Sequence, residues 1–325
     1  MDNIQNAEMR ELALSLPTIV MAAKAKSTTT KYDRGWSKWL DWCKDKYEIR
    51  RVPANPFHVA MYLSYVLKNS NNNGALTTAF YGIRWGHQIN GFPSPTDHPF
   101  VRMTYEGAVR LCEKSPRSPK DPITPEILKC LFNAFNSDSL ADLRFLLMCA
   151  LGFFGFFRIE ELLTVQLKDI SIKDTHLEIF LEKAKNDQHR DGNIVYISRL
   201  ESKYCPVALV EKFLKASKIS ISTHRSVFLI PKIIKIKQGH KVHISAGISY
   251  TRAREIFKEK LDNFDSEGNF GLHSLRSGGA SAAAESLTDE RLISKHGRWV
   301  SDRARNSYIK DSVQNRLKIT RQLGL

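Results

Sequence analysis

The sequence predicts a mostly helical protein with a small antiparallel β-sheet or hairpin, preceded by a smaller all-helical bundle. Three observations support this fold class. Apolar residues recur at helical spacing through the first 110 or so positions. A proline-rich segment then interrupts the chain at 115–122. Beyond it, an alternating strand pattern lies among further helical segments. With 325 residues, 42% of them hydrophobic, the chain is long enough for two domains with real cores.

The first domain is predicted at residues 27–114, after an N-terminal arm at 1–26 that reads as a short helix or a loose segment. In the first predicted helix, Ser27 to Thr30 supplies capping residues, and the apolar side chains that follow keep helical spacing. Polar loops separate this helix from three more. The four expected helices span 27–46, 58–69, 76–89 and 100–113. Short amphipathic helices with polar connections favour a compact helical bundle.

Residues 115–122 form the predicted linker, since three prolines in eight residues favour an extended conformation. The second domain is expected at 123–325, where Thr124 is an N-cap and Pro125 the first helical position. An apolar helix is predicted over 142–157 and ends at Arg158. An arginine emerging from so apolar a segment needs an anion or acid, and Glu161 follows one turn later. The alternative is that this pair merely closes a helix.

The alternating segment Leu177–Leu181 and the segment Asn193–Ile197 predict an antiparallel hairpin, with a polar turn over 186–192. Lys183 and Lys185 are placed at its tip, where a solvated lysine is the ordinary alternative. Helices are expected at 205–217 and 251–261, and an extended basic segment at 232–241.

The C-terminal stretch 271–310 brings four chemically distinctive side chains to fixed offsets. His273 and Arg276 are three apart and therefore share one face of a helix. A run of small residues at 278–284 allows that helix to pack closely against a neighbour. Trp299 precedes Tyr308 by nine positions, and Ser301 or Asp302 is expected to cap the helix that carries Tyr308. Taken singly, each residue is better explained as an ordinary core or surface side chain.

The formal net charge of +15 favours a polyanionic partner, nucleic acid before membrane, although an inert basic surface has the same composition. The five cysteines are scattered and include no CxxC pair, so neither a zinc site nor a disulfide framework is indicated. The sequence contains no P-loop and no metal-ligand cluster. No stretch is long and apolar enough to span a bilayer, and we expect no membrane partner.

The C-terminal motifs together resemble those of the tyrosine recombinase (phage-integrase-like) family. The segments that carry the resemblance read HSLRSGGA, KHGRW and YIKDS. Their sequences most resemble those of recombinases carried by eukaryotic mobile elements. The resemblance implies a core-DNA-binding bundle at 27–114 and a catalytic domain at 123–325. It also implies six catalytic residues, Arg158, Lys185, His273, Arg276, Trp299 and Tyr308, with Lys183 as the fallback for Lys185 and His296 ranked second to Trp299. Glu161 would steady Arg158.

The implied reaction is site-specific cutting and rejoining of DNA through a 3′-phosphotyrosine intermediate. Tyr308 would be the nucleophile, and Lys185 would protonate the leaving 5′ oxygen. Arg158 and Arg276 would hold the non-bridging phosphate oxygens. Because the covalent link preserves the bond energy and arginines neutralise charge, no metal ion and no nucleotide cofactor is required.

The expected partner is double-stranded DNA, bound by a homo-oligomer that is a dimer on one site and a tetramer on synapsis. A terminal helix at 312–323 would dock on a neighbouring protomer, and the nucleus is the expected compartment. Two other functions share these features: a type IB topoisomerase, and a domesticated DNA-binding protein that no longer cuts. Candidate DNA contacts are Arg34, Lys38, Arg84, Arg117, Lys120, Lys235 and Lys237.

Overall fold

The chain folds into two compact units, Met1–Arg117 and Ser118–Leu325. The computed structural model describes residues 5–112, 119–135, 139–182, 192–237, 239–262, 264, 268–286 and 288–323, without the side chains of 314 and 319. The boundary between the units falls inside the proline-rich segment that was predicted as a linker.

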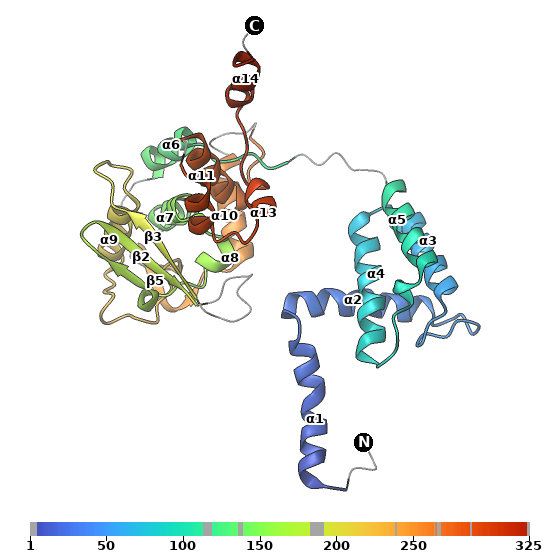
Figure 1. Ribbon diagram of the computed structural model, residues 1–325. Coiled ribbons are helices and arrows are strands. Elements are labelled where there is room, and N and C mark those ends of the chain that lie inside the picture. The colour runs from blue at the N-terminus through green and yellow to red at the C-terminus, as the bar shows by residue number, and fades with distance from the viewer. Residues whose placement is uncertain are drawn as a thin grey trace. The chain divides into compact units, whose positions relative to one another are not determined.

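The first unit is entirely helical in its described residues (Figure 1). Its elements are α1 (Ala7–Ala22), α2 (Lys26–Trp42), α3 (Pro56–Ser70), α4 (Asn73–Ile89), η1 (Pro95–Asp97) and α5 (Pro99–Leu111). Helices α2 and α4 pack at backbone contact, because a Cβ added to Gly82 would lie 2.7 Å from the Cα of Gly35. Trp39, Leu63 and Ile83 are fully buried in the core between the helices. The predicted bundle is therefore present, with helix ends shifted by a few residues.

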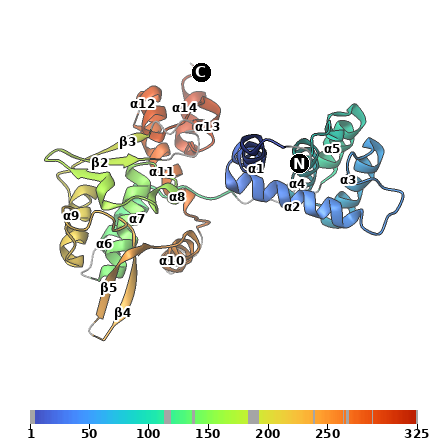
Figure 2. The same cartoon turned by 90° about the horizontal axis from the view of Figure 1, so that it is seen from below.

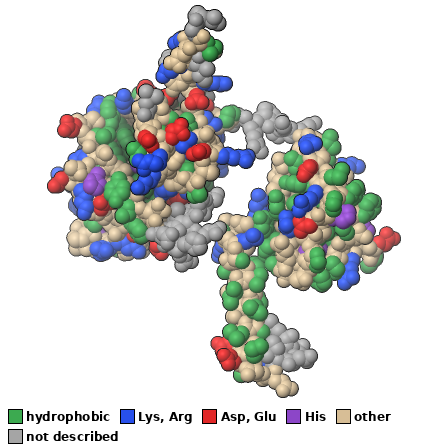
Figure 3. All heavy atoms as spheres, in the orientation of Figure 1, with side chains coloured by type: hydrophobic (Ala, Val, Ile, Leu, Met, Phe, Trp, Pro, Cys, Tyr) green, Lys and Arg blue, Asp and Glu red, His purple; other side chains and the backbone are tan. Residues whose placement is uncertain are grey.

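Helix α1 resolves the choice left open for the N-terminal arm in favour of a helix. None of its residues is buried, although most of its sequence is apolar. Figure 3 shows hydrophobic side chains exposed along it. The exposed apolar residues of α1 are Met9, Leu12, Leu14, Leu16, Ile19, Val20 and Met21.

The second unit mixes helices with two small antiparallel sheets, which confirms the predicted fold class. Its helices are α6 (Pro125–Phe135), α7 (Leu140–Phe154), α8 (Ile159–Leu162), η2 (Leu167–Asp169), α9 (Pro206–Ser217), α10 (Tyr250–Asp262), α11 (His273–Glu285), α12 (Glu290–Gly297), α13 (Asp302–Asn306) and α14 (Val313–Arg321). Its strands are β1 (Ile170–Ile172), β2 (His176–Leu181), β3 (Asn193–Ser198), β4 (Pro231–Ile236) and β5 (Gly239–Gly247).

The predicted hairpin is the β2–β3 pair, in which Leu177 lies opposite Ile197. The sequence missed β1, which adds a third antiparallel strand on the other edge of β2. Buried and exposed side chains alternate along β2, so one face of this sheet packs on the core. The described residues of the basic segment, 232–237 and 239–241, lie in a separate two-stranded ribbon, β4–β5, that projects from the unit (Figure 2).

Helix α7 is the centre of the second unit, since every residue from Leu143 to Phe153 is buried. Helix α11 lies directly against it, because the run of small residues allows backbone contact. A Cβ added to Gly279 would meet the carbonyl oxygen of Phe153 at 2.2 Å, and one added to Gly278 would meet that of Ile123 at 1.9 Å. Close packing of this helix was expected, and the glycines are its physical cause.

The described end of the predicted linker packs with the second unit. The Asp121 N–H donates to the Asn269 carbonyl at 2.9 Å, and the Ile123 N–H donates to the Ser274 carbonyl at 3.0 Å. The Lys120 side chain also donates to the Asn269 side chain. Residues 119–122 are therefore held in place and are not a free tether. Among the described helices, none combines the length and apolar character that crossing a membrane requires.

Candidate functional site

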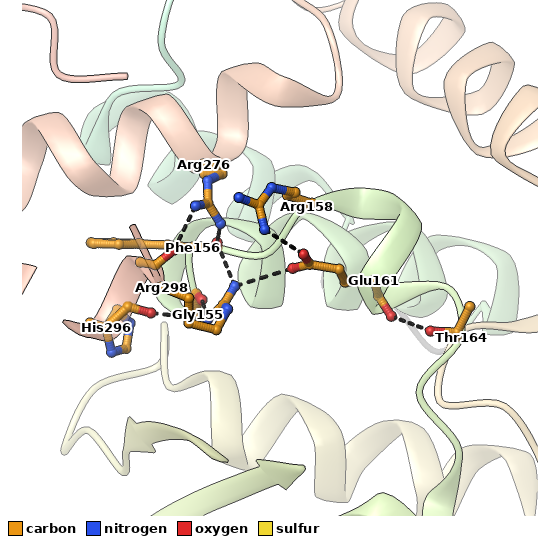
Figure 4. Close-up of polar contacts among 9 residues, drawn as sticks. Gly155, Phe156, Arg158, Glu161, Thr164, Arg276, His296 and Arg298 are labelled. Carbon is orange, nitrogen blue, oxygen red and sulfur yellow. Dashed lines mark hydrogen bonds and ion pairs between the residues drawn. The ribbon is translucent and has the colours of Figure 1, made fainter. Parts of the chain in front are cut away.

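Three arginines from distant parts of the second unit lie close together, and one carboxylate, that of Glu161, pairs with two of them (Figure 4). Arg158 is the N-cap residue of α8, Arg276 lies in the first turn of α11, and Arg298 is the C-cap residue of α12. Arg158 Nη1 contacts Glu161 Oε1 at 2.6 Å, and Arg298 Nη2 contacts Glu161 Oε2 at 3.4 Å. The Arg158–Glu161 pair expected from the sequence is thus present, and the carboxylate also holds a second arginine.

The predicted helix over 142–157 ends earlier than expected, at Phe154. The chain then turns sharply, because Phe156 adopts a left-handed backbone conformation with φ of 45°. This conformation is unfavourable for a bulky residue and persists only where surrounding contacts hold it. The turn aims the Phe156 carbonyl at the arginine cluster, where it accepts hydrogen bonds from both Arg276 and Arg298.

Arg276 is completely buried. Its Nη1 donates to the Phe156 carbonyl and its Nη2 to the Gly297 carbonyl at 2.6 Å. Burial, and then the nearby charges of Arg158 and Arg298, lower the pKa of Arg276 to about 9. Since a guanidinium at this site is poorly compensated by protein groups, a bound anion would stabilise its charged form.

The cluster has unused capacity for an anion. The Glu161 carboxylate pairs with Arg158 and Arg298, while Arg276 donates to two uncharged backbone carbonyls, so positive charge is in excess. Three buried donors here have no hydrogen-bond partner in the described part of the chain: Arg276 Nε, Arg298 Nε and the indole Nε1 of Trp299. Buried polar groups are rarely left unpaired, and each such group points to a missing partner. Phosphate, which accepts several hydrogen bonds, matches this donor set.

Trp299 and Tyr308 lie beside Arg276, as the sequence predicted for a shared site. The Arg276 Cζ is 4.5 Å from the Trp299 ring centroid and 4.9 Å from that of Tyr308. The two aromatic rings are 5.5 Å apart. The Tyr308 segment is tied to α11, because Ser277 donates to the Tyr308 carbonyl and Ser281 accepts from the Lys310 N–H.

The expectation that Tyr308 sits on a helix was wrong. Ser301 does cap a helix, accepting from the Ala304 N–H, but α13 ends at Asn306. Tyr308 follows in a turn, and its backbone N–H donates to the Arg305 carbonyl at 2.9 Å. The phenol is therefore positioned by a turn with a backbone hydrogen bond, and not by a helix.

His273 begins α11, one turn before Arg276, and its side chain is exposed. His296, the second choice for the Trp299 position, has a structural role instead: its Nε2–H donates to the Phe154 carbonyl at 2.8 Å. Burial lowers the pKa of His296, which favours the neutral ring. Lys183 and Lys185 lie outside the described residues, between β2 and β3.

Sequence reasoning missed Arg298, whose side chain is only 5% exposed. It directly precedes Trp299 and adopts a left-handed conformation with φ of 57°. The Gly-Arg-Trp sequence at a helix end is a weak signal for a special position. The spacing of apolar residues, however, does not distinguish a buried arginine here from a solvated one. Within the described residues, no group of three or more His, Cys, Asp and Glu side chains is arranged to hold a metal ion.

The candidate DNA contacts have varied surroundings. Arg34 and Lys38 are exposed and line a groove of about 730 Å³ between α2, α3 and α4, together with Trp42 and Tyr65. Arg84 is instead paired with Asp97 at 3.0 Å.

In the second unit, Lys235 and Lys237 are exposed on the β4–β5 ribbon. Lys120 is exposed and bound to Asn269. Arg117 lies outside the described residues.

No protein-family model matches the chain. A curated protein, "Integrase/recombinase xerD homolog" of Selenomonas ruminantium, is 26% identical over 328 residues, covering 97% of this chain and 93% of that protein. The full-length similarity agrees with the family resemblance of the C-terminal motifs.

Solved structures show the same fold. The XerH site-specific recombinase, in a post-cleavage complex with palindromic difH substrate, has a TM-score of 0.57 at 12% identity and covers 91% of this chain and 79% of its own. A lambda integrase dimer bound to a COC′ core site has a TM-score of 0.55 at 14% identity, covering 93% and 95%. The Tn1549 transposon integrase in complex with transposon right end DNA has a TM-score of 0.54 at 10% identity, covering 96% and 98%.

Proposed function

We propose that this chain, which belongs to the tyrosine recombinase family, is a DNA recombinase that cuts and rejoins strands at specific sites through a 3′-phosphotyrosine intermediate. The observation that carries the proposal is the arginine cluster beside Tyr308. Its excess positive charge and unpaired donors fit one phosphodiester, and the phenol ring lies against the same guanidinium.

The first step is recognition of the scissile phosphate. Arg158 and Arg276 hold its non-bridging oxygens, and the Trp299 indole N–H adds a third donor. These donors are fixed before the substrate arrives, so they stabilise the charge that develops on the oxygens in the transition state. His273, one turn before Arg276 on α11, completes the cage or accepts the phenol proton.

The second step is transfer of the strand to the enzyme. The Tyr308 oxygen forms a bond to phosphorus while the bond from phosphorus to the 5′ oxygen breaks. The phenol proton passes to a base, for which His273 is the candidate, and Lys185 donates a proton to the leaving 5′ oxygen. A 5′ hydroxyl from another strand then attacks the phosphotyrosine and restores a phosphodiester, so the two steps need no external energy source.

Double-stranded DNA is the partner in this proposal. The high positive charge of the chain and its similarity to DNA-bound recombinases support this choice. Of the candidate contacts, Arg34, Lys38, Lys235 and Lys237 are exposed and available to phosphates, and Lys120 also meets solvent. Arg84 is the weakest candidate because it is already paired with Asp97, a carboxylate that it shares with Arg102.

Assembly as a dimer on one site and a tetramer on synapsis is part of the proposal. Helix α14 supports it, since Val313 and Leu317 are exposed apolar residues with no protein surface to cover them in the described chain. Sedimentation with and without DNA tests this for the chain lacking residues 312–325. Loss of the larger species is expected, and unchanged assembly would rule out this role for α14.

A eukaryotic mobile element is the proposed origin, supported by the wording of the C-terminal motifs, and the nucleus is then the compartment that holds the substrate. Microscopy of the tagged chain in eukaryotic cells tests the compartment. Accumulation in the nucleus is expected, and exclusion from it would contradict the assignment.

Covalent trapping on nicked duplexes tests the reaction itself. In such substrates the strand beyond the cut diffuses away, so a phosphotyrosine adduct accumulates. A library of duplexes screened this way also reports the preferred site. The wild-type chain should form an adduct, whereas Tyr308→Phe should bind the same DNA without forming one. An adduct formed by Tyr308→Phe would refute the assignment of the nucleophile.

A further inference from the structure

We infer that Arg298 is a positioning residue that locks Arg158 and Arg276 into one phosphate-binding geometry. The inference rests on the proposed function and adds a residue to its machinery. Arg298 contacts the groups that orient the two catalytic arginines, and it directly precedes Trp299 in the chain. Four acceptors surround its guanidinium: the carbonyls of Gly155, Phe156 and His296, and the Glu161 carboxylate.

The first link runs through the Phe156 carbonyl. Arg298 Nη2 donates to this oxygen at 3.0 Å, and Arg276 Nη1 donates to the same oxygen. Because Phe156 is in the left-handed region, its carbonyl direction needs outside contacts to persist. Arg298 also donates to the Gly155 carbonyl at 3.3 Å, so it holds two consecutive peptide units of this turn. The orientation of Arg276 therefore depends on Arg298.

The second link runs through the Glu161 carboxylate. One oxygen contacts Arg158 at 2.6 Å and the other contacts Arg298 at 3.4 Å. A carboxylate with a cation on each oxygen has little freedom to rotate, so Arg158 is held against a fixed partner. Without Arg298, one oxygen of a buried carboxylate would lose its charged partner.

The third link is covalent. Arg298 ends α12 and is followed directly by Trp299, whose ring stacks on Arg276. Holding the Arg298 side chain between α7 and α8 therefore fixes the backbone from which the indole projects. Only a planar, forked guanidinium can donate to four acceptors spread over two segments, so lysine is a poor substitute.

The test compares cleavage of two nicked duplexes that differ only at the scissile linkage. One carries the natural phosphate, and the other a methylphosphonate, in which a methyl group replaces one non-bridging oxygen and removes the negative charge. A neutral linkage needs less guanidinium stabilisation. A defect in arginine placement should therefore shrink on the methylphosphonate, whereas a general loss of folded protein lowers both rates equally.

The variants are Arg298→Met, Arg298→Lys and the control Arg144→Met. Arg144 is also a buried arginine of this unit, but it donates to the Pro231 carbonyl at 3.2 Å, away from the cluster. The single-turnover rate of adduct formation should fall about 100-fold for Arg298→Met on phosphate and less than about 10-fold on methylphosphonate. Arg298→Lys should show the same pattern with a smaller loss, and it carries the test if the Met variant does not fold.

The outcomes distinguish a positioning role for Arg298 from a general loss of folded protein. Equal losses on the two linkages, or a wild-type rate for Arg298→Met on phosphate, would overturn the positioning role. Arg144→Met should lose activity equally on both linkages, and only in proportion to any loss of folded protein. Absence of an adduct with wild-type protein on phosphate would instead contradict the proposed function, independently of Arg298.

Discussion

The indole N–H of Trp299 offers a sharp prediction because it is buried and has no partner among the described residues. Trp299→Phe removes this donor, and Trp299→His retains one N–H on a ring that is also smaller than indole. Both variants lose packing against Arg276 and Tyr308, so the difference between them isolates the donor. A donor aimed at a transition-state oxygen contributes roughly 100- to 1,000-fold in rate.

We therefore expect Trp299→Phe to form the phosphotyrosine adduct at least about 100-fold more slowly than Trp299→His. The assay is single-turnover trapping on a nicked duplex at pH 8, where an ordinary histidine is neutral and still carries one N–H. Stability should not explain the gap, because Trp299→Phe also removes a buried unpaired donor, which costs about 1–3 kcal/mol in the native protein. Equal rates for the two variants would show that Trp299 acts through ring packing alone.

Three further predictions concern stability and DNA affinity. Burial lowers the pKa values of His87 and His296, so the folded state binds these protons less readily than the unfolded state. The free energy of unfolding, measured by urea titration, should therefore be fully present above pH 6.5 and decline as the pH falls below it. Gly279→Ala should destabilise by about 1–3 kcal/mol, since the new methyl would meet a backbone carbonyl of α7, whereas Gly107→Ala, with open space around it, should stabilise slightly. Replacing Lys235 and Lys237 by glutamine should reduce the salt dependence of DNA binding by about 0.9 in slope per lost phosphate contact.

A specific outcome would contradict each of these three predictions. A pH-independent free energy of unfolding between pH 5 and 7.5 would mean that neither buried histidine opposes protonation. Equal stability changes at the two glycines would mean that α11 is not held at backbone contact with α7. An unchanged salt slope would remove the β4–β5 ribbon from the DNA interface.

Much of the fold followed from periodicity and from turn chemistry. Helix α6 begins at the predicted residue, and α9 and α10 begin and end within one residue of the predicted bounds, because capping residues and apolar spacing are local signals. Strand β1 was missed because three residues carry no usable alternation. The end of α7 was misplaced because its apolar run continues through Phe157, while the helix stops at a left-handed residue that is not glycine.

The site shows the same limit. Arg158, Arg276, Trp299 and Tyr308 were identified by their motif, and the structure brings these four together. Arg298 was not, since its partners lie as far as 143 positions away in the sequence. Arg298 is buried against the turn at Gly155 and Phe156, and the conformation of that turn depends on Arg298 and Arg276. Reciprocal support of this kind leaves no local pattern in a sequence.

Peptide mapping of the trapped complex tests the central claim most directly. Trypsin cleaves after Arg305 and Lys310, so the wild-type adduct, trimmed with nuclease, should yield the peptide Asn306–Lys310 carrying a 3′-phosphonucleotide on Tyr308. A nucleotide on any other peptide, such as one containing Tyr250, would contradict the account. So would unmodified Tyr308 in a preparation that cuts and rejoins DNA.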